Sequence, residues 1–274
     1  MSQTSAPRDD APANAAFGPL LRTWRERRRL SQQELSLIAD VSARHLSFLE
    51  TGRSRPSRTM VLSLADHLNV PLRERNELLS AAGFAAAYPQ RPLEAPEMRS
   101  VRAAVDQILE GHEPYPAVAV DRWWNVVAAN RPVTALIADV DPAVLGPPTN
   151  VYRLTLHPDG MAPLIVNLAG FAHHLVDRLR RDAQTTGDPH LNTLLAEVED
   201  YPTVRALPRH IDTPDRVVVP MRLRHPHGEL ALFTTITTFG TPADVTVAEL
   251  ALELFYPLDA VTAERLRLIA GSAE

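Results

Sequence analysis

The sequence predicts two folded domains of different class: an all-α domain over residues 17–83 and an α+β domain with an antiparallel sheet over residues 97–271. Residues 17–83 carry helix-start and helix-stop residues at short intervals, as expected for about five short helices. Three prolines within residues 88–96 cannot continue a helix, so residues 84–96 are assigned to a linker. Beyond it, helical stretches precede three consecutive strand-like stretches, the order typical of α+β domains.

The composition excludes several classes of protein. The 274 residues include no cysteine, which excludes disulfides, cysteine-ligated zinc and thiol catalysis. No apolar run approaches the roughly 18 residues that cross a bilayer. Residues 1–16 are rich in alanine, proline and aspartate and lack the apolar core of a secretory signal. We therefore expect a disordered tail on a cytoplasmic protein that does not associate with membranes.

The charge is divided unevenly between the two domains. All 28 basic residues are arginine. Residues 17–83 carry 11 arginines against seven acidic residues, whereas residues 84–274 carry 16 against 24. A basic module joined to an acidic one indicates a polyanionic partner for the first domain.

Capping residues place the N-terminal helices. Leu20, Leu21 and Trp24 form the inner face of the first helix. Ser31 precedes the second helix, and Glu34 three residues later completes a capping box. The other helices are expected to start at Ser42, Ser57 and Pro71, and the last to end near Gly83.

Residues 32–51 meet the steric requirements of a helix-turn-helix. Two helices that cross steeply through a short turn need apolar residues at set offsets and a small residue where they approach. Ser36 is the small residue, and Asp40 stands at the turn position where φ is positive, which aspartate tolerates. The apolar positions are Leu35, Ala39, Val41, Leu46 and Leu49.

Residues 17–82 resemble the Cro/phage-repressor (XRE) family of helix-turn-helix proteins. The resemblance lies in Ser31-Gln-Gln-Glu-Leu35, in Val41-Ser42 and in the segment from Leu49 to Ser57. It implies a lambda-repressor-like five-helix fold and a double-stranded DNA operator as partner. The alternative is a helical bundle that carries these offsets by chance. In the family, an arginine of the first helix pairs with a glutamate after the recognition helix, which implies a structural ion pair between Arg25 and Glu50.

The helix that starts at Ser42 is the predicted recognition helix, entering the major groove by its N-terminus. Arg44 is the strongest candidate for base reading, because its guanidinium can pair with guanine O6 and N7; a phosphate contact is the alternative. For Arg27 and Arg28 we expect a solvated helix end. The predicted base-facing residues are Ser42, Ala43, Arg44, Ser47 and Phe48, and the predicted phosphate contacts are Gln32, Arg53, Arg55 and Arg58.

The second domain is predicted to mix helices with short strands. Hydrophobic periodicity and the content of β-branched residues distinguish its helices from its strands. Helices are expected over residues 98–110, 130–138, 161–184, 189–200 and 262–270, and strands over residues 116–120, 126–130, 216–224, 229–239 and 247–256.

From Phe17 to about Gly271 the chain resembles the MmyB-type family of actinobacterial XRE regulators. The first resemblance is residues 115–132, where two strands precede a helix opened by Asn130-Arg131, as in a PAS-like sheet. The resemblance implies a PAS-like fold and a lipophilic, fatty-acid-like effector. The chain departs from the family at Ala206-Leu-Pro208 and in the strand that ends at Pro257. Further matches are Asp188-Pro-x-Leu191 with the Glu197 helix, Arg209-His210, Leu223-Arg-His-Pro226 and Gly228-Glu-Leu230.

The implied effector suggests two sets of ligand-binding residues. Burying ten methylenes contributes roughly 8 kcal/mol, against an immobilisation cost of at least about 4 kcal/mol. For each of the residues named below, the alternative is an ordinary place in the core. The adjacent Trp123 and Trp124 are expected to point opposite ways. A carboxylate head is assigned to Arg122, Tyr152, His174, Arg178 and Thr235, and the apolar wall to Val118, Trp124, Val126, Leu168, Phe171, Leu175, Phe233 and Phe255.

The other functional classes fit the sequence less well. His173-His174 and His225-Pro-His227 lack a third ligand at metal-binding spacing, so no metal is expected. No nucleophile elbow, Walker loop or dinucleotide fingerprint is present, so the protein is not expected to be an enzyme or to carry a cofactor beyond the effector. We expect a homodimer on a pseudo-palindromic operator. The alternative is a second domain that serves only dimerisation or contacts with a protein such as RNA polymerase.

Overall fold

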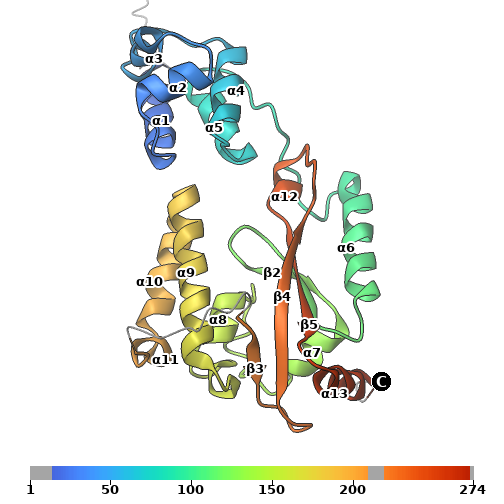
Figure 1. The fold of residues 1–274 in the computed structure, drawn as a ribbon. Coiled ribbons are helices and arrows are strands. Elements are labelled where there is room, and N and C mark those ends of the chain that lie inside the picture. Colours follow the sequence, from blue (N-terminus) through green and yellow to red (C-terminus); the bar gives the residue numbers. More distant parts are fainter. Residues whose placement is uncertain (1–13, 209–218, 272–274) are drawn as a thin grey trace, which may run out of the picture. The chain divides into compact units, whose positions relative to one another are not determined.

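A computed structural model describes residues 14–208 and 219–271 (Figure 1). The chain divides into two compact units between Gln90 and Arg91, inside the predicted linker, and residues 243–245 group with the first unit. Of the expected disordered tail, residues 1–13 lie outside the described part, and residues 14–16 already belong to the first helix.

The first unit is all-α, as predicted. Its five helices are α1 (Asn14–Arg27), α2 (Gln32–Ile38), α3 (Ala43–Glu50), α4 (Arg58–His67) and α5 (Leu72–Ala81). Ser31 and Glu34 form the predicted capping box at α2, and the Ser42 and Ser57 hydroxyls accept hydrogen bonds at the starts of α3 and α4. The core joins Phe17, Leu21 and Trp24 of α1 to residues of the four other helices.

The helix-turn-helix geometry depends on two special backbone positions. Asp40, in the turn between α2 and α3, has a φ of 51°, as predicted for this position. Gly18 lets α1 approach α3 closely, because a Cβ at Gly18 would lie 2.5 Å from the carbonyl oxygen of Glu50. The backbone of α1 therefore lies directly against the last residues of α3.

The second unit is built on an antiparallel five-stranded sheet in the order β2-β1-β5-β4-β3. The strands are β1 (Ala117–Val120), β2 (Val126–Ala129), β3 (Met221–Leu223), β4 (Leu230–Thr238) and β5 (Ala251–Pro257). This order places the first hairpin at one edge and the last strand at the centre, which is the PAS-like arrangement. The predicted α+β class with an antiparallel sheet is confirmed.

Helices cover both faces of the sheet (Figure 1). On one face, Val105 and Leu109 of α6 (Arg99–Gly111) pack against alternate residues of β1 and β5. The other face packs against α7 (Arg131–Leu136), α8 (Val151–Leu156) and α9 (Leu168–Thr186), and α10 (Pro189–Asp200) packs on α9. The described residues also include η1 (Pro96–Met98), η2 (Ala162–Leu164), α11 (Pro202–Arg205), α12 (Val245–Ala248) and α13 (Ala260–Gly271).

Three predicted elements differ in extent. The helix predicted over 161–184 is interrupted after η2, because Ile165 forms a β-bridge with Leu223 and the Asn167 side chain bonds to backbone atoms next to β3. The strand predicted over 247–256 starts only at Ala251, since α12 precedes it. The strand predicted over 216–224 is limited to β3 within the described residues. Residues 216–218 and the Arg209-His210 match lie outside them.

Candidate nucleic-acid interface and ligand cavity

The N-terminal end of α3 presents a basic and aromatic surface. Ser42, Ala43 and Arg44 are exposed, and Ser47 and Phe48 are half-buried. The Arg44 guanidinium lies 5.3 Å from the Phe48 ring centroid, and Arg53 lies 6.0 Å from the same ring. Both guanidinium groups therefore lie within cation–π distance of the Phe48 ring.

A buried ion pair joins α1 to the end of α3. Arg25 Nε and Nη2 donate to the two carboxylate oxygens of Glu50 at 2.6 and 3.0 Å. Arg25 Nη1 also donates to the Leu30 carbonyl at 2.7 Å, and Gln32 Nε2 donates to Glu50 Oε2 at 2.8 Å. The ion pair implied by the family resemblance is thus present, with every charged oxygen accepting a hydrogen bond.

Three of the arginine and glutamine side chains discussed above have partners within the first unit. The Gln32 amide is held by Glu50, so it positions α2 rather than extending freely toward a phosphate. Arg58 Nη1 donates to the Ala85 carbonyl at 2.6 Å. Arg28 is not a solvated helix end, because it donates to the carbonyls of Leu68 and Asn69 at the end of α4. Arg53 and Arg55 are exposed, beside the start of α4.

The second unit contains an apolar cavity of about 250 Å³. It lies between the sheet and α7, α8 and α9. β5 contributes the alternate residues Glu253 and Phe255, as the two-residue period of a strand requires, and Pro116 and Val118 alternate in the same way at the start of β1. Four of its lining side chains are polar, namely Thr134, Thr149, Thr155 and Glu253. The cavity is lined by Pro116, Val118, Val126, Ala129, Val133, Thr134, Leu136, Ile137, Thr149, Val151, Leu154, Thr155, Met161, Phe171, Leu175, Met221, Leu232, Glu253 and Phe255.

Five of the predicted ligand-binding residues line this cavity, and all five are apolar: Val118, Val126, Phe171, Leu175 and Phe255. The predicted carboxylate-binding residues do not. Thr235 and His174 are exposed, and Arg122 is held by ion pairs with Asp188 and Glu249. Leu168, Trp124 and Phe233 do not line the cavity either, and Phe233 stacks on Tyr256 at a centroid distance of 5.3 Å.

Tyr152 and Arg178 lie next to the cavity and bind each other. Arg178 Nε donates to the Tyr152 hydroxyl at 3.0 Å, and its guanidinium lies 4.1 Å from the Trp124 ring centroid. Arg178 Nη1 donates to Glu253 Oε1 at 3.3 Å. Burial raises the pKa of Tyr152 to about 12, although the charge of Arg178 acts in the opposite direction. Arg178 thus reaches the cavity only through Glu253.

The two adjacent tryptophans have separate roles. Trp124 is buried in the core with a φ of 65°. Trp123 is half-buried, and its Nε1 donates to Asp188 Oδ2 at 3.0 Å. Asp188 also caps α10 by accepting from the His190 N–H. Burial alone would raise the pKa of Asp188, but these hydrogen bonds and the charge of Arg122 hold it below its ordinary value.

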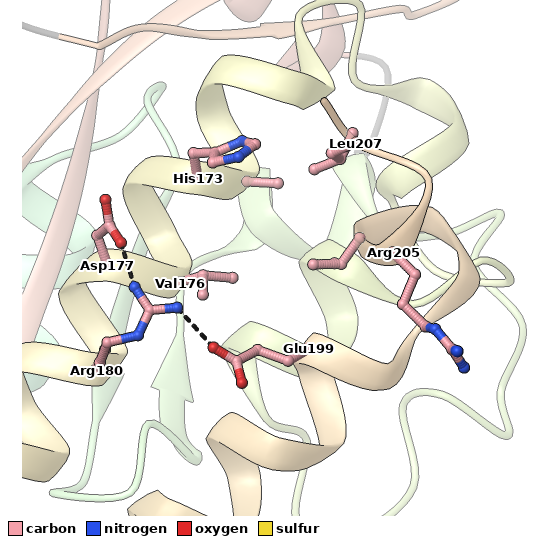
Figure 2. Close-up of a pocket in the computed structure, with 9 residues that line it drawn as sticks. His173, Val176, Asp177, Arg180, Glu199, Arg205 and Leu207 are labelled. Carbon is pink, nitrogen blue, oxygen red and sulfur yellow. Dashed lines mark hydrogen bonds and ion pairs between the residues drawn. The ribbon is translucent and has the colours of Figure 1, made fainter. Parts of the chain in front are cut away.

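A larger groove of about 720 Å³ lies between α9 and the α10–α11 segment (Figure 2). Figure 2 shows Arg180 between Asp177 and Glu199, and both carboxylates pair with it. Arg205 pairs with Asp200. Because its charges neutralise one another, this groove is a weaker ligand site than the apolar cavity.

Sequence reasoning missed Glu253. In the predicted strand it is one acidic residue among apolar ones, a pattern that usually marks a solvent-facing position. Its only available signal was that Ala251 and Phe255, on the same face, are apolar. Helices cover both faces of the sheet, so Glu253 is only 4% exposed.

The chain resembles known proteins over both units. Residues 101–269 match the family model described as MmyB-like transcription regulator ligand binding domain, and residues 16–78 match a helix-turn-helix domain. No curated protein matches the chain. Within the described residues, no helix has the length and apolar character needed to span a membrane.

Solved structures of two proteins illustrate the similarity. One is the clp gene regulator ClgR from Corynebacterium glutamicum. A first structure of it is 30% identical over 26% of this chain and 91% of that chain, and a second is 24% identical over 38% and 98%, both with a TM-score of 0.24. The other is an RNA-binding Light-Oxygen-Voltage receptor, 12% identical over 94% of this chain and 62% of that chain, with a TM-score of 0.25.

The two family matches fit the two units already described. The helix-turn-helix match covers α2 to α4 and most of α1 and α5, and the ligand-binding match contains the whole sheet and every residue that lines the apolar cavity. Because the second match alone spans more than half of the 274 residues, the chain belongs to the MmyB-like family of transcription regulators.

Proposed function

We propose that the protein binds a pseudo-palindromic DNA operator as a homodimer and that a lipophilic, fatty-acid-like effector in the apolar cavity changes its operator affinity. The N-terminal end of α3 reads bases, with Arg44 as the principal reader. Arg53 and Arg55 contact phosphates and supply the salt dependence. The regulator acts on transcription by occupying the operator or by contacting RNA polymerase from it.

The apolar cavity is the observation that carries this proposal. A protein cavity of about 150 Å³ lined by Leu, Ile and Phe stays dry and binds benzene. By the same scale, the cavity of about 250 Å³ accommodates roughly ten carbon atoms. A domain used only for dimerisation has no need of such a space, since voids weaken a core.

An effector can regulate only if it binds one state of the protein better than the other. The cavity wall combines residues of β1, β2, β5, α7, α8 and α9. An occupant that fills it therefore favours one packing of helices on the sheet. A preference of about 1.4 kcal/mol for the DNA-binding state would change operator affinity about tenfold.

Native mass spectrometry of the purified full chain, followed by organic extraction, tests the proposal. We expect a discrete extra mass that extracts as a lipid, and operator affinity that changes when the lipid is removed. The variant Val118→Phe places a larger side chain in the cavity and should abolish the extra mass. Val127→Phe, the same substitution at a 41% exposed position on the neighbouring strand, is the matched control. A chain without ligand that binds no added lipid would contradict the effector proposal and leave a domain for dimerisation.

A further inference from the structure

A single carboxylate lies in the wall of the apolar cavity, at the centre of the sheet. Glu253 stands on β5, the middle strand, and its Cα pairs with that of Val118 on β1. Both residues line the cavity, whereas their neighbours Leu252 and Leu254 face α6. A carboxylate that is only 4% exposed at such a position needs polar partners.

The polar partners of Glu253 are incomplete. Arg178 Nη1 reaches Oε1 at 3.3 Å, a long contact for an ion pair. Arg178 Nη2 is buried and has no hydrogen-bond partner in the part of the chain that the structure describes. The described residues also provide no donor to Glu253 Oε2. Because Arg178 does not line the cavity, the unused hydrogen-bonding capacity that a ligand can reach is that of the Glu253 carboxylate, and a ligand that supplies the missing bond must donate it.

The charges next to the cavity disfavour an ionised ligand. Glu253 and Arg178 compensate one another, so a carboxylate on the ligand would be buried next to Glu253 without a countercharge of its own. An ammonium group would have to share a carboxylate that Arg178 already holds. The Thr149 hydroxyl donates to the Leu145 carbonyl, which leaves Thr134 and Thr155 as the other neutral polar groups.

We infer that the effector is a molecule of about ten carbons whose polar end is an uncharged hydroxyl that donates to Glu253, and that Glu253 is the residue that rejects a carboxylate. This inference rests on the proposed function, since it requires that the cavity hold an effector. It differs from the fatty-acid expectation only in the end group. Glu253 determines specificity by accepting a hydrogen bond, which an alcohol can donate and an ionised acid cannot.

The test compares three probes of equal chain length on the full-length protein stripped of lipid. Binding of 1-decanol, decanoate and decylammonium is measured by calorimetry at pH 7.5, where both ions are charged. We expect decanol to bind at least about tenfold more tightly than either ion, the factor that corresponds to one lost hydrogen bond. Decanoate or decylammonium binding as tightly as decanol would overturn the inference while leaving the proposed function intact. If none of the three binds, both fail.

A variant reverses the selectivity. Glu253→Gln removes the negative charge that disfavours a ligand carboxylate and supplies an amide N–H donor in its place, so decanoate should bind at least about tenfold more tightly than it binds the parent. Glu249→Gln is the matched control, because Glu249 pairs with Arg122 and does not line the cavity. Equal effects of the two substitutions on decanoate binding would overturn the role of Glu253. The probe comparison on the parent decides the inference if Glu253→Gln does not fold.

Discussion

Replacing Glu50 with alanine tests how the recognition helix is held. The Glu50 side chain is 2% exposed and the Arg25 side chain 9% exposed, so the ion pair between them is removed from water. Glu50→Ala leaves the Arg25 guanidinium with its bond to the Leu30 carbonyl and leaves the Gln32 amide without its acceptor. The substitution therefore leaves the buried Arg25 charge without its buried carboxylate partner at the junction of α1, α2 and α3.

The expected cost follows from the burial and the remaining bonds. Removing one partner of a buried ion pair costs about 3–5 kcal/mol. Since Arg25 keeps one of its three hydrogen bonds, we place the loss near the lower end, about 3 kcal/mol. Replacing both partners with apolar side chains, as in Arg25→Met with Glu50→Leu, should recover most of this loss because no charge is then left buried.

Native-state hydrogen exchange of the full chain is the suitable assay, because it reports each unit separately. Amides of α1 and α3 should exchange about two orders of magnitude faster in Glu50→Ala, while amides of the sheet in the second unit keep their rates. Glu26→Ala is the control. Glu26 lies on the same helix as Arg25, pairs with Arg22 and lies 3.7 Å from Arg25 Nη2, but the Glu26 and Arg22 side chains are more than half exposed.

Two outcomes would refute the reasoning. If Glu50→Ala and Glu26→Ala change exchange equally, burial of the pair does not determine its contribution. If the double replacement is as unstable as Glu50→Ala, the loss comes from packing at the α1–α3 contact around Gly18 rather than from the stranded charge.

Two further predictions concern the DNA interface and acid stability. Arg44→Ala should cost about 1–3 kcal/mol at a single base pair and relax specificity there, whereas Arg55→Ala should weaken all sequences alike and flatten the salt slope by about one unit. Titrations of operator variants at several salt concentrations separate the two, and identical behaviour would contradict the division into base and phosphate contacts. The low pKa of Asp188 means that its ionised form stabilises the fold above its ordinary pKa of 3.8, and that this contribution is lost as the pH falls through the lower folded-state value. Asp188→Asn should therefore flatten the dependence of unfolding on pH below about 4. Denaturant unfolding followed by tryptophan fluorescence measures this, and an unchanged pH profile would refute it.

The N-terminal unit could be predicted almost entirely from its sequence because local residues determine it. Caps act over three residues, and the turn at Asp40 depends on the φ tolerance of one side chain. The bonds of Arg28 and Arg58 could not be predicted, because their acceptors lie 40 and 27 residues away. Which carbonyl a long side chain reaches depends on how the helices cross, and sequence periodicity does not contain that information.

The cavity could be predicted only in its apolar character. Alternation along β1 gives the face of Val118, but it does not show which helix covers that face. α8 supplies three lining residues and was not predicted as a helix. Its six residues are too few to show a helical period, whereas α7, equally short, was predicted from Asn130-Arg131 at its start. Nor does the sequence show that two of the residues predicted to bind a carboxylate, Arg122 and Arg178, are already paired in the fold. Arg122 and Arg178 are cations in suitable segments, but each already has acidic partners from distant strands and helices.

The Arg25–Glu50 and Arg178–Glu253 pairs differ in how completely their hydrogen-bonding groups are used. Around Glu50, both carboxylate oxygens accept hydrogen bonds and Arg25 uses all three of its nitrogens. Around Glu253, the corresponding pair is longer, and one arginine nitrogen is buried without a partner in the described structure. The network around Glu50 has no unused hydrogen-bonding group for a ligand, so the Arg25–Glu50 pair holds α3 in place. An incomplete one beside an apolar cavity is stabilised by any neutral molecule that completes it, which couples occupation of the cavity to the free energy of the sheet that surrounds it.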